Sequence, residues 1–234
     1  MFGRRLINTQ QGGGCTTDTL QILGDTSCVA TYRLNGDATD LSGNYNGTAT
    51  NVSYVAGKFD DAGSFNGSNG RIDLPNINNI ASSNVSFSVS LWIKTTSSTY
   101  SGVFSDFPFS GFDGFSLVIE FQTNGTFVIF NRITAAQSYN LTTPVLNDGN
   151  WHNLLITNNI STLKQGVYID GVFYSQITLG SGTKTSSANT IQVGYYNLNS
   201  TPQYYFNGSI DQVRIFNRAI TAAEVTTLYN EVAC

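Results

Sequence analysis

Few side chains in this sequence could carry out acid–base or nucleophilic chemistry. A retaining glycosidase needs two carboxyl groups about 5 Å apart, one as the nucleophile and one as the acid. The chain has 12 Asp but only 3 Glu: Glu120 stands alone in a predicted strand, and Glu224 and Glu231 belong to a predicted terminal helix. The single histidine, His152, has no Ser or Cys nucleophile in a motif such as G-x-S-x-G. We therefore expect no enzyme activity.

Two groups of aromatic residues lie outside clear strand patterns and suit the binding of sugars. The C–H faces of a sugar stack on aromatic rings, while its hydroxyl groups bind Asn and Asp. The first group is Phe107, Phe109 and Phe112, and the second is Tyr195, Tyr196, Tyr204 and Tyr205. The alternative is that most of these rings cap the core or fill contacts between subunits.

The composition limits the classes of function. Charged residues make up 11% of the chain, the formal net charge is −4, and Ser, Thr, Asn and Gly together account for 99 of the 234 residues. The 11 basic residues are scattered, which argues against binding of nucleic acid. No apolar run approaches the roughly 18 residues of a membrane span. We therefore expect neither a nucleic-acid partner nor a membrane span.

The elements that must position these residues are mostly short strands. Residues 87–93 alternate between apolar and polar side chains, with one apolar face. Residues 115–121 and 126–130 flank Asn124-Gly125, and residues 166–169 and 172–174 flank Asp170-Gly171; both pairs predict β-hairpins, because these turn residues tolerate positive φ. Further strands are expected at 154–157, 191–195 and 210–216.

One helix stands out near the end of the chain. Thr221 and Glu224 are spaced as a capping box, and Val225, Leu228 and Tyr229 then share one helical face. The spacing predicts a helix over residues 222–230. Many strands and one terminal helix indicate an all-β, two-sheet antiparallel jelly-roll sandwich. We expect an N-terminal arm over residues 1–28 and a single sandwich domain over residues 29–234.

Segments spread along the sandwich resemble the laminin-G-like branch of the concanavalin-A-like lectin and glucanase superfamily. They read YRLNGDATDLSGN at 32–44, GKF at 57–59, SFNGSNGRI at 64–72, FSVSLWIK at 87–94, NDGNWH at 147–152, YIDG at 168–171 and FNGSIDQVRIFNRAI at 206–220. The resemblance implies the jelly-roll fold and a structural role for Trp151-His152, in which His152 serves in packing or hydrogen bonding. The glucanases of this superfamily carry a clustered E-x-D-x-x-E strand motif, which is missing from this sequence.

The resemblance also implies a structural calcium ion where the first and last segments meet. Asp211 matches the ligand position in the family's I-D-x-V-R motif. Asp37 and Asp40, in the loop after the first strand, match less closely, so Asn35 or a carbonyl oxygen could serve in their place. The alternative is that these carboxylates are held by backbone amides and Arg214.

In a sandwich of this family the first and last segments run side by side, which implies a bridge between Cys28 and Cys234. Such a bridge would close a loop of about 200 residues. Pairing of Cys15 with Cys28 is the rival arrangement, with Cys15 otherwise free or bridging subunits. In an intracellular assembly all three cysteines would stay reduced.

Together these features predict a non-catalytic surface or structural protein of a virus particle, most simply a bacteriophage. It would decorate the capsid or form part of a fibre, contact other virion subunits through its N-terminal arm, and bind a cell-surface glycan; a homo-oligomer is compatible with this role. The alternative is an extracellular carbohydrate-binding or adhesion module of a secreted cellular protein. A glycoside hydrolase is a third hypothesis, which the missing pair of carboxylates disfavours. The functional expectation rests largely on analogy of fold.

Overall fold

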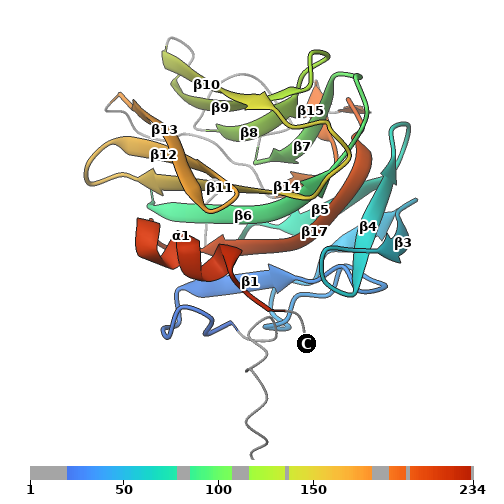
Figure 1. Cartoon of the computed structure of the whole chain (residues 1–234), viewed down its shortest axis with the longest axis horizontal. Coiled ribbons are helices and arrows are strands. Elements are labelled where there is room, and N and C mark those ends of the chain that lie inside the picture. The colour runs from blue at the N-terminus through green and yellow to red at the C-terminus, as the bar shows by residue number, and fades with distance from the viewer. Residues whose placement is uncertain are drawn as a thin grey trace, which may run out of the picture.

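The computed structural model describes residues 20–77, 85–106, 116–134, 137–180, 190–198 and 201–232. Within these ranges the chain forms two antiparallel sheets packed face to face, a small two-stranded sheet and one helix (Figure 1). This architecture confirms the predicted all-β sandwich with one short C-terminal helix. No helix among the described residues is both long enough and apolar enough to cross a bilayer.

Each large sheet draws its strands from distant parts of the sequence. The first has the order β13 (Val172–Thr178), β12 (Lys164–Ile169), β11 (His152–Asn159), β6 (Phe87–Lys94), β17 (Asn207–Phe216), β4 (Asp61–Asn66) and β3 (Ser53–Ala56), and β1 (Cys28–Tyr32) also pairs with β17. The second has the order β10 (Gln137–Val145), β9 (Thr126–Thr134), β8 (Ser116–Phe121), β7 (Ser101–Ser105), β14 (Thr190–Val193), β5 (Arg71–Pro75) and β2 (Thr48–Thr50). The small sheet pairs β15 (Tyr196–Leu198) with β16 (Thr201–Gln203).

Strand alternation places the core between the two large sheets. On β6 the side chains of Phe87, Val89, Leu91 and Ile93 belong to the main buried cluster, as the sequence pattern predicts. Each such side chain contributes roughly 1.5–3 kcal/mol by leaving water. The intervening residues of β6, which include Trp92, face outward from the sandwich.

Both predicted hairpins are confirmed, but their turns differ. Asp170 and Gly171 join β12 to β13 with φ angles of 51° and 76°, the two positive values that a two-residue turn requires. Between β8 and β9 only Gly125 has a positive φ, 84°, and its amide donates to the Gln122 carbonyl at 3.0 Å. The second hairpin therefore has a longer connection than the Asn-Gly pair alone predicts.

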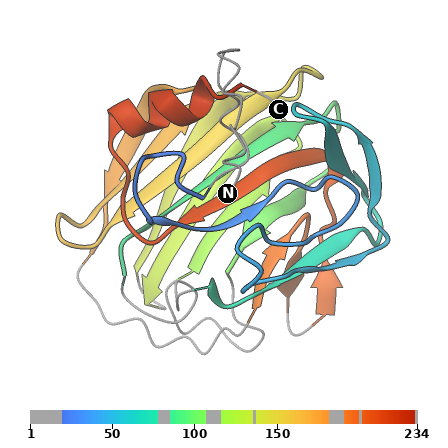
Figure 2. The ribbon, with the colours of Figure 1, turned by 90° about the horizontal axis from the view of Figure 1, so that it is seen from below.

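The outer face of the eight-stranded sheet is covered by the helix α1 (Ala222–Tyr229) and by residues 20–27. Figure 2 shows both crossing this face. A second buried cluster lies beneath them, formed by Cys28, Leu155, Phe216, Ile220, Val225 and Leu228, with Leu20, Ile22 and Leu23 packed against it. The helix begins at the predicted capping box, in which the Thr221 hydroxyl accepts from the Glu224 amide and the Glu224 carboxylate accepts from the Thr221 amide.

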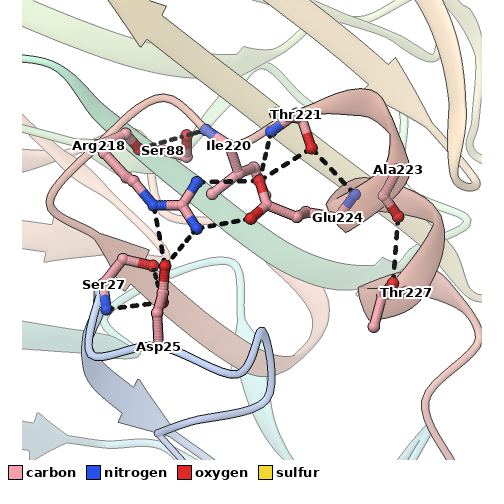
Figure 3. A network of polar contacts seen from close by, with 9 residues as sticks. All are labelled: Asp25, Ser27, Ser88, Arg218, Ile220, Thr221, Ala223, Glu224 and Thr227. Atoms are coloured by element: carbon pink, nitrogen blue, oxygen red, sulfur yellow. Dashed lines mark hydrogen bonds and ion pairs between the residues drawn. The ribbon is translucent and has the colours of Figure 1, made fainter.

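A single arginine ties the N-terminal segment to the start of this helix (Figure 3). The Arg218 guanidinium donates to Asp25 and to Glu224, each at 2.6 Å. Hydrogen bonds from Ser27 and then from Arg218 lower the pKa of Asp25 to about 2, and Arg218 likewise lowers the pKa of Glu224 to about 2. Both carboxylates therefore stay ionised at neutral pH and hold the arginine between them.

The packing of residues 20–27 moves the expected start of the sandwich domain. Residues 1–28 were expected to form a separate arm, yet Leu20 onward packs on the sheet and β1 begins at Cys28. The apolar residues Leu20, Ile22 and Leu23 fill the second cluster, a contact that the lack of strand alternation in this segment does not reveal. Residues 1–19 lie outside the described residues.

Candidate functional site

Five tyrosines gather where β7, β14 and β15 meet, and we call them the tyrosine cluster: Tyr100, Tyr195, Tyr196, Tyr204 and Tyr205. The rings of Tyr196 and Tyr204 stack with centroids 4.7 Å apart, and Tyr100 stands edge-on to Tyr204 at 5.1 Å. Tyr195 stacks on Tyr205 at 6.0 Å. Tyr195 is buried, whereas the other four are half-buried and keep part of their surface in contact with solvent.

Two glycines allow the chain to bring these rings together. Gly194, which follows β14, has a φ of 79°, and a Cβ there would lie 2.1 Å from the Phe65 ring. Gly102 on β7 lies against the backbone of Tyr195 and Tyr196, where a Cβ would come within 2.6–2.7 Å of their backbone atoms. The Gly102 amide donates to the Tyr204 carbonyl at 2.7 Å. Close backbone approach at both points turns the segment after β14 back over β7.

Tyr204 carries backbone strain. Its φ is 53°, in the left-handed region that bulky residues rarely adopt. Strain of this kind costs of order 1–3 kcal/mol and persists where the surrounding structure enforces it, often at functional sites. Here it turns the Tyr204 ring onto Tyr196.

Polar groups border the rings on the outer face of the seven-stranded sheet. The Tyr100 and Tyr196 hydroxyls lie 2.9 Å apart, and Tyr100 also bonds to the Glu120 carboxylate. Burial raises the pKa of Glu120, against the opposing effect of its bonds to Tyr100 and Gln122. The Tyr195 hydroxyl donates to Asp73, whose other oxygen lies 3.4 Å from the Arg71 Nε.

This arrangement presents partly exposed aromatic rings beside hydroxyl and carboxylate groups that are fixed by hydrogen bonds. Apolar ring faces suit the C–H faces of sugars, and the bordering oxygens suit their hydroxyls. The cluster has the chemistry of a carbohydrate-binding surface with little freedom left in its side chains.

The predicted aromatic contacts have mixed outcomes. Tyr195, Tyr196, Tyr204 and Tyr205 do lie together, although buried Tyr195 serves mainly to support the others. Phe107, Phe109 and Phe112 lie outside the described residues. Sequence reasoning missed Tyr100 and Glu120; the register that pairs Gly102 on β7 with Glu120 on β8 brings them to the cluster.

The three carboxylates expected to bind calcium do not share a site. Among the described residues, no group of three or more His, Cys, Asp or Glu side chains could hold a metal ion. Asp211 is buried on β17 opposite Trp92 of β6, and its Oδ2 accepts from the Lys58 and Phe59 amides, each at 2.9 Å. Arg214 pairs with Glu231 instead of Asp211.

The loop carboxylates are likewise committed to local hydrogen bonds. Asp40 accepts from the Thr31 amide at 2.9 Å and from the Ser42 hydroxyl, and Asp37 accepts from the Thr39 amide at 2.8 Å. The predicted set therefore does not fit one calcium ion, because strand and turn geometry direct each carboxylate to nearby amides. Calcium binding stays a prediction from the sequence.

Of the predicted bridge, only Cys28 lies within the described residues, while Cys15 and Cys234 lie outside them. Cys28 is buried and has no disulfide partner among the described residues; its sulfur lies 3.3 Å from the Thr31 hydroxyl and 3.6 Å from the Ala30 carbonyl oxygen. Burial raises the pKa of this thiol. The pairing with Cys234 stays a prediction.

His152 serves in hydrogen bonding, as expected. Its Nδ1 lies 2.8 Å from Asp170 and its Nε2 lies 3.1 Å from Asp148. Burial alone would lower the pKa of His152, but the bonds to Asp170 and Asp148 outweigh it and raise the pKa. The imidazole thereby joins the loop before β11 to the turn between β12 and β13.

Comparison with known proteins agrees with this fold. Residues 66–226 match the sequence profile of the concanavalin A-like lectin/glucanases superfamily, so the chain belongs to that superfamily and the laminin-G-like resemblance is confirmed. No curated protein sequence matches the chain.

Similar solved structures include binding domains of larger proteins. Domain 4 of AbnA, an extracellular GH43 arabinanase from Geobacillus stearothermophilus, was determined in complex with arabinotriose; it is 25% identical, with a TM-score of 0.67 over 87% of this chain and 98% of that domain. The binding domain of Paraclostridial Mosquitocidal Protein 1 is 18% identical, with a TM-score of 0.70 over 87% of this chain and 52% of that one.

A third similar structure is that of botulinum neurotoxin type C, a toxin whose cell entry is described as dependent on interaction with two ganglioside molecules. It is 16% identical, with a TM-score of 0.69 over 91% of this chain and 53% of that one. The chain thus spans about half the length of these toxin domains. At this level of identity the two toxin structures share the fold alone.

Proposed function

We propose that this member of the concanavalin A-like lectin/glucanase superfamily is a non-catalytic glycan-binding protein whose sugar site is the tyrosine cluster. The observation that carries the proposal is the stacking of Tyr196, Tyr204 and Tyr100 beside the Glu120 carboxylate. Sugar recognition requires ring faces and fixed polar groups in this combination. The arabinotriose complex of the 25% identical arabinanase domain adds support.

The proposal excludes glycoside hydrolysis at this site. Glu120 and Asp73 are the carboxylates that border the cluster among the described residues, and each accepts a hydrogen bond from a tyrosine hydroxyl, Glu120 from Tyr100 and Asp73 from Tyr195. Hydrolysis with retention or inversion uses a pair of carboxyl groups. Because both carboxylates are held by tyrosine hydroxyls, and Asp73 also pairs with Arg71, they suit the binding of sugar hydroxyl groups instead of the acid and nucleophile roles.

A glycan array provides the test. We expect saturable binding by the wild-type chain and a loss of about tenfold or more in Tyr196→Ala, because a stacking ring at the centre of a site carries a large share of the affinity. Tyr174→Ala is the matched control, since Tyr174 is 43% exposed on β13 of the other sheet. Tyr100→Phe removes only a hydroxyl and keeps the ring in place.

The proposal fails if no glycan binds, or if Tyr196→Ala binds as well as the wild type. Equal loss in Tyr174→Ala would also contradict it, because that result would assign the effect to general destabilisation. Thermal melting of each variant separates loss of the site from loss of the fold.

As the setting for this activity we propose the surface of a virus particle, with the N-terminal residues attaching the sandwich to other virion subunits. The charge-poor composition, rich in Ser, Thr and Asn, supports packing on a lattice. The alternative setting is a secreted carbohydrate-binding or adhesion module of a cellular protein.

Co-purification with particles tests this setting. Deletion of residues 1–19 leaves the packed segment from Leu20 and the Asp25–Arg218 ion pair intact. We expect this truncated protein to fold, to bind glycan and to lose attachment. Normal attachment would remove the role of the arm, and absence of the full chain from purified particles would contradict the setting.

A further inference from the structure

A polar cavity of about 510 Å³ lies beside residues 95–99, in the segment that leads from β6 of one large sheet to β7 of the other. Six of its ten lining residues carry hydroxyl groups. The lining consists of Lys94, Thr95, Thr96, Ser97, Ser98, Thr99, Gly149, Asn207, Gly208 and Ser209. No acidic side chain belongs to this lining.

Hydrogen bonds fix the walls of the cavity. The Thr95 hydroxyl donates to the Asn207 carbonyl at 2.7 Å and accepts from the Ser97 amide at 2.9 Å. The Asn147 amide group donates to the Ser97 carbonyl at 2.9 Å, and the Gly149 amide donates to the Thr95 carbonyl at 3.1 Å. The connection is thus held on both sides, so the cavity is organised before any ligand arrives.

The cavity has one charged lining residue, Lys94. Arg71, Arg214 and Arg218 each form an ion pair with a carboxylate, whereas no described carboxylate lies within ion-pair distance of the Lys94 ammonium. The Lys94 Nζ instead lies 6.0 Å from the centre of the Trp151 ring.

One carboxylate directly adjoins a lining residue in the sequence, and it already forms hydrogen bonds with other groups. Asp148, beside Gly149, accepts from the Asn150 amide at 2.8 Å and lies 3.1 Å from the His152 Nε2. The cavity therefore combines a lysine ammonium with hydroxyl donors and excludes competing negative charge from its lining. This combination favours an anion that also carries hydroxyl groups.

The cavity adjoins the tyrosine cluster through consecutive residues. Thr99 lines the cavity and Tyr100 belongs to the cluster, so their Cα atoms are about 3.8 Å apart. On the opposite wall, Asn207 follows Tyr204 and Tyr205 closely in the sequence. A chain of two or three sugars resting on the tyrosines could therefore place its next residue in the cavity.

We propose that the cavity binds an acidic sugar, one that bears a carboxylate or sulfate group, through Lys94 and the hydroxyls of residues 95–99. The inference rests on the proposed glycan site and adds the charge of the ligand. It assigns stacking to the tyrosine cluster and selection for negative charge to the cavity.

The test is an array that presents uronate, sialylated and sulfated glycans beside their methyl-esterified, desialylated and desulfated counterparts. We expect the wild type to prefer the acidic member of at least one pair by about tenfold, the ratio typical of one hydrogen bond to a charged group. Lys94→Met keeps the aliphatic stem and should abolish that preference. Lys94→Arg should retain it, and so should the control Lys164→Met, whose lysine lies on β12 and binds Thr178.

The two proposals fail in different ways. Equal binding of acidic and neutral members, or a preference that survives Lys94→Met, overturns the cavity assignment while leaving the tyrosine site in place. Absence of binding to every glycan overturns both. Thermal melting of Lys94→Met, together with its retained binding of neutral glycans, shows that this variant keeps its fold.

Discussion

The buried carboxyl group of Asp211 should make the stability of this protein fall as the pH rises. Burial raises its pKa to about 7, in spite of hydrogen bonds from the Phe59 and Lys58 amides, and the negative charge of Glu231 adds to the rise. Its Oδ1 has no hydrogen-bond partner among the described residues. Glu231 itself pairs with Arg214, and the ammonium of Lys58 lies over the Trp92 ring.

The sign and size of the effect follow from proton linkage. An unfolded aspartate ionises near pH 3.8, whereas folded Asp211 keeps its proton up to about pH 7. Between these values the folded state holds more protons, so the free energy of unfolding decreases as the pH rises. Each pH unit between the two pKa values, 3.8 and about 7, lowers the free energy of unfolding by about 1.4 kcal/mol, so the whole effect amounts to about 4 kcal/mol. Roughly 2.5 kcal/mol of it is lost between pH 5 and pH 8.

Urea unfolding of the wild type and Asp211→Asn at pH 5, 6, 7 and 8 measures this loss. The asparagine Oδ1 can accept from the same two amides and carries no charge, so its stability should exceed that of the wild type by an amount that grows by roughly 2.5 kcal/mol from pH 5 to pH 8. Asp37→Asn is the matched control, because Asp37 is exposed and bonds only to the Thr39 amide among the described residues. Parallel curves for the wild type and Asp211→Asn would refute the reasoning.

The same experiment decides between a buried acid and a calcium ligand. A bound calcium ion would keep Asp211 ionised, so chelation would lower the melting temperature of the wild type by several degrees and Asp211→Asn would be the less stable protein at pH 8. A buried acid without a bound ion would instead give no shift on chelation, so the two outcomes are distinct.

Two further substitutions test the packing that supports the site and the segment that precedes β1. Gly194→Ala should lower the free energy of unfolding by about 2–4 kcal/mol, because the added Cβ would overlap the Phe65 ring. The control Gly24→Ala, at a similar φ of 77° but with no atom within 4 Å, should lower it by only about 1 kcal/mol. Equal losses of stability in thermal melting would contradict the clash at Gly194. Arg218→Gln should lower the melting temperature by about 2–4 °C at pH 7, a modest effect because Arg218 and Asp25 are 32% and 44% exposed. Since the pKa values of Asp25 and Glu224 are lowered to about 2, this difference should disappear as the pH falls from 4 to 2, and its persistence at pH 2 would refute the assignment.

Local patterns in the sequence predicted those parts of the fold that depend on neighbouring residues. The capping box at Thr221 and Glu224 placed the start of the helix, and the Asp170-Gly171 pair identified a turn with two positive φ angles. The alternation over residues 87–93 identified the inner face of β6. Each of these signals arises within a few residues, where backbone geometry leaves few alternatives.

The site depended on contacts between distant residues, and the sequence revealed it only in part. Tyr195, Tyr196, Tyr204 and Tyr205 were found because they are paired in the sequence, but Tyr100 joins them only through the sheet register. The calcium prediction relied on the first and last segments meeting. They do meet, since β1 pairs with β17, yet Asp211 accepts from the amides of residues 58 and 59, whereas Asp37 and Asp40 accept from amides of β1 and their own loop.

The tyrosine cluster and the packed N-terminal segment lie on the outer faces of different sheets. Asp73 alternates with the core residues Ile72 and Leu74, so the tyrosine that binds Asp73 lies on the outer face of the seven-stranded sheet. Leu20 and its neighbours pack on the outer face of the eight-stranded sheet, together with the helix, which lies on the far side of the sandwich from β15 (Figure 1). A protein attached through its N-terminal residues would therefore present the tyrosine cluster away from its point of attachment. This separation lets attachment and glycan binding take place at the same time, and it predicts that removing residues 1–19 leaves glycan affinity unchanged.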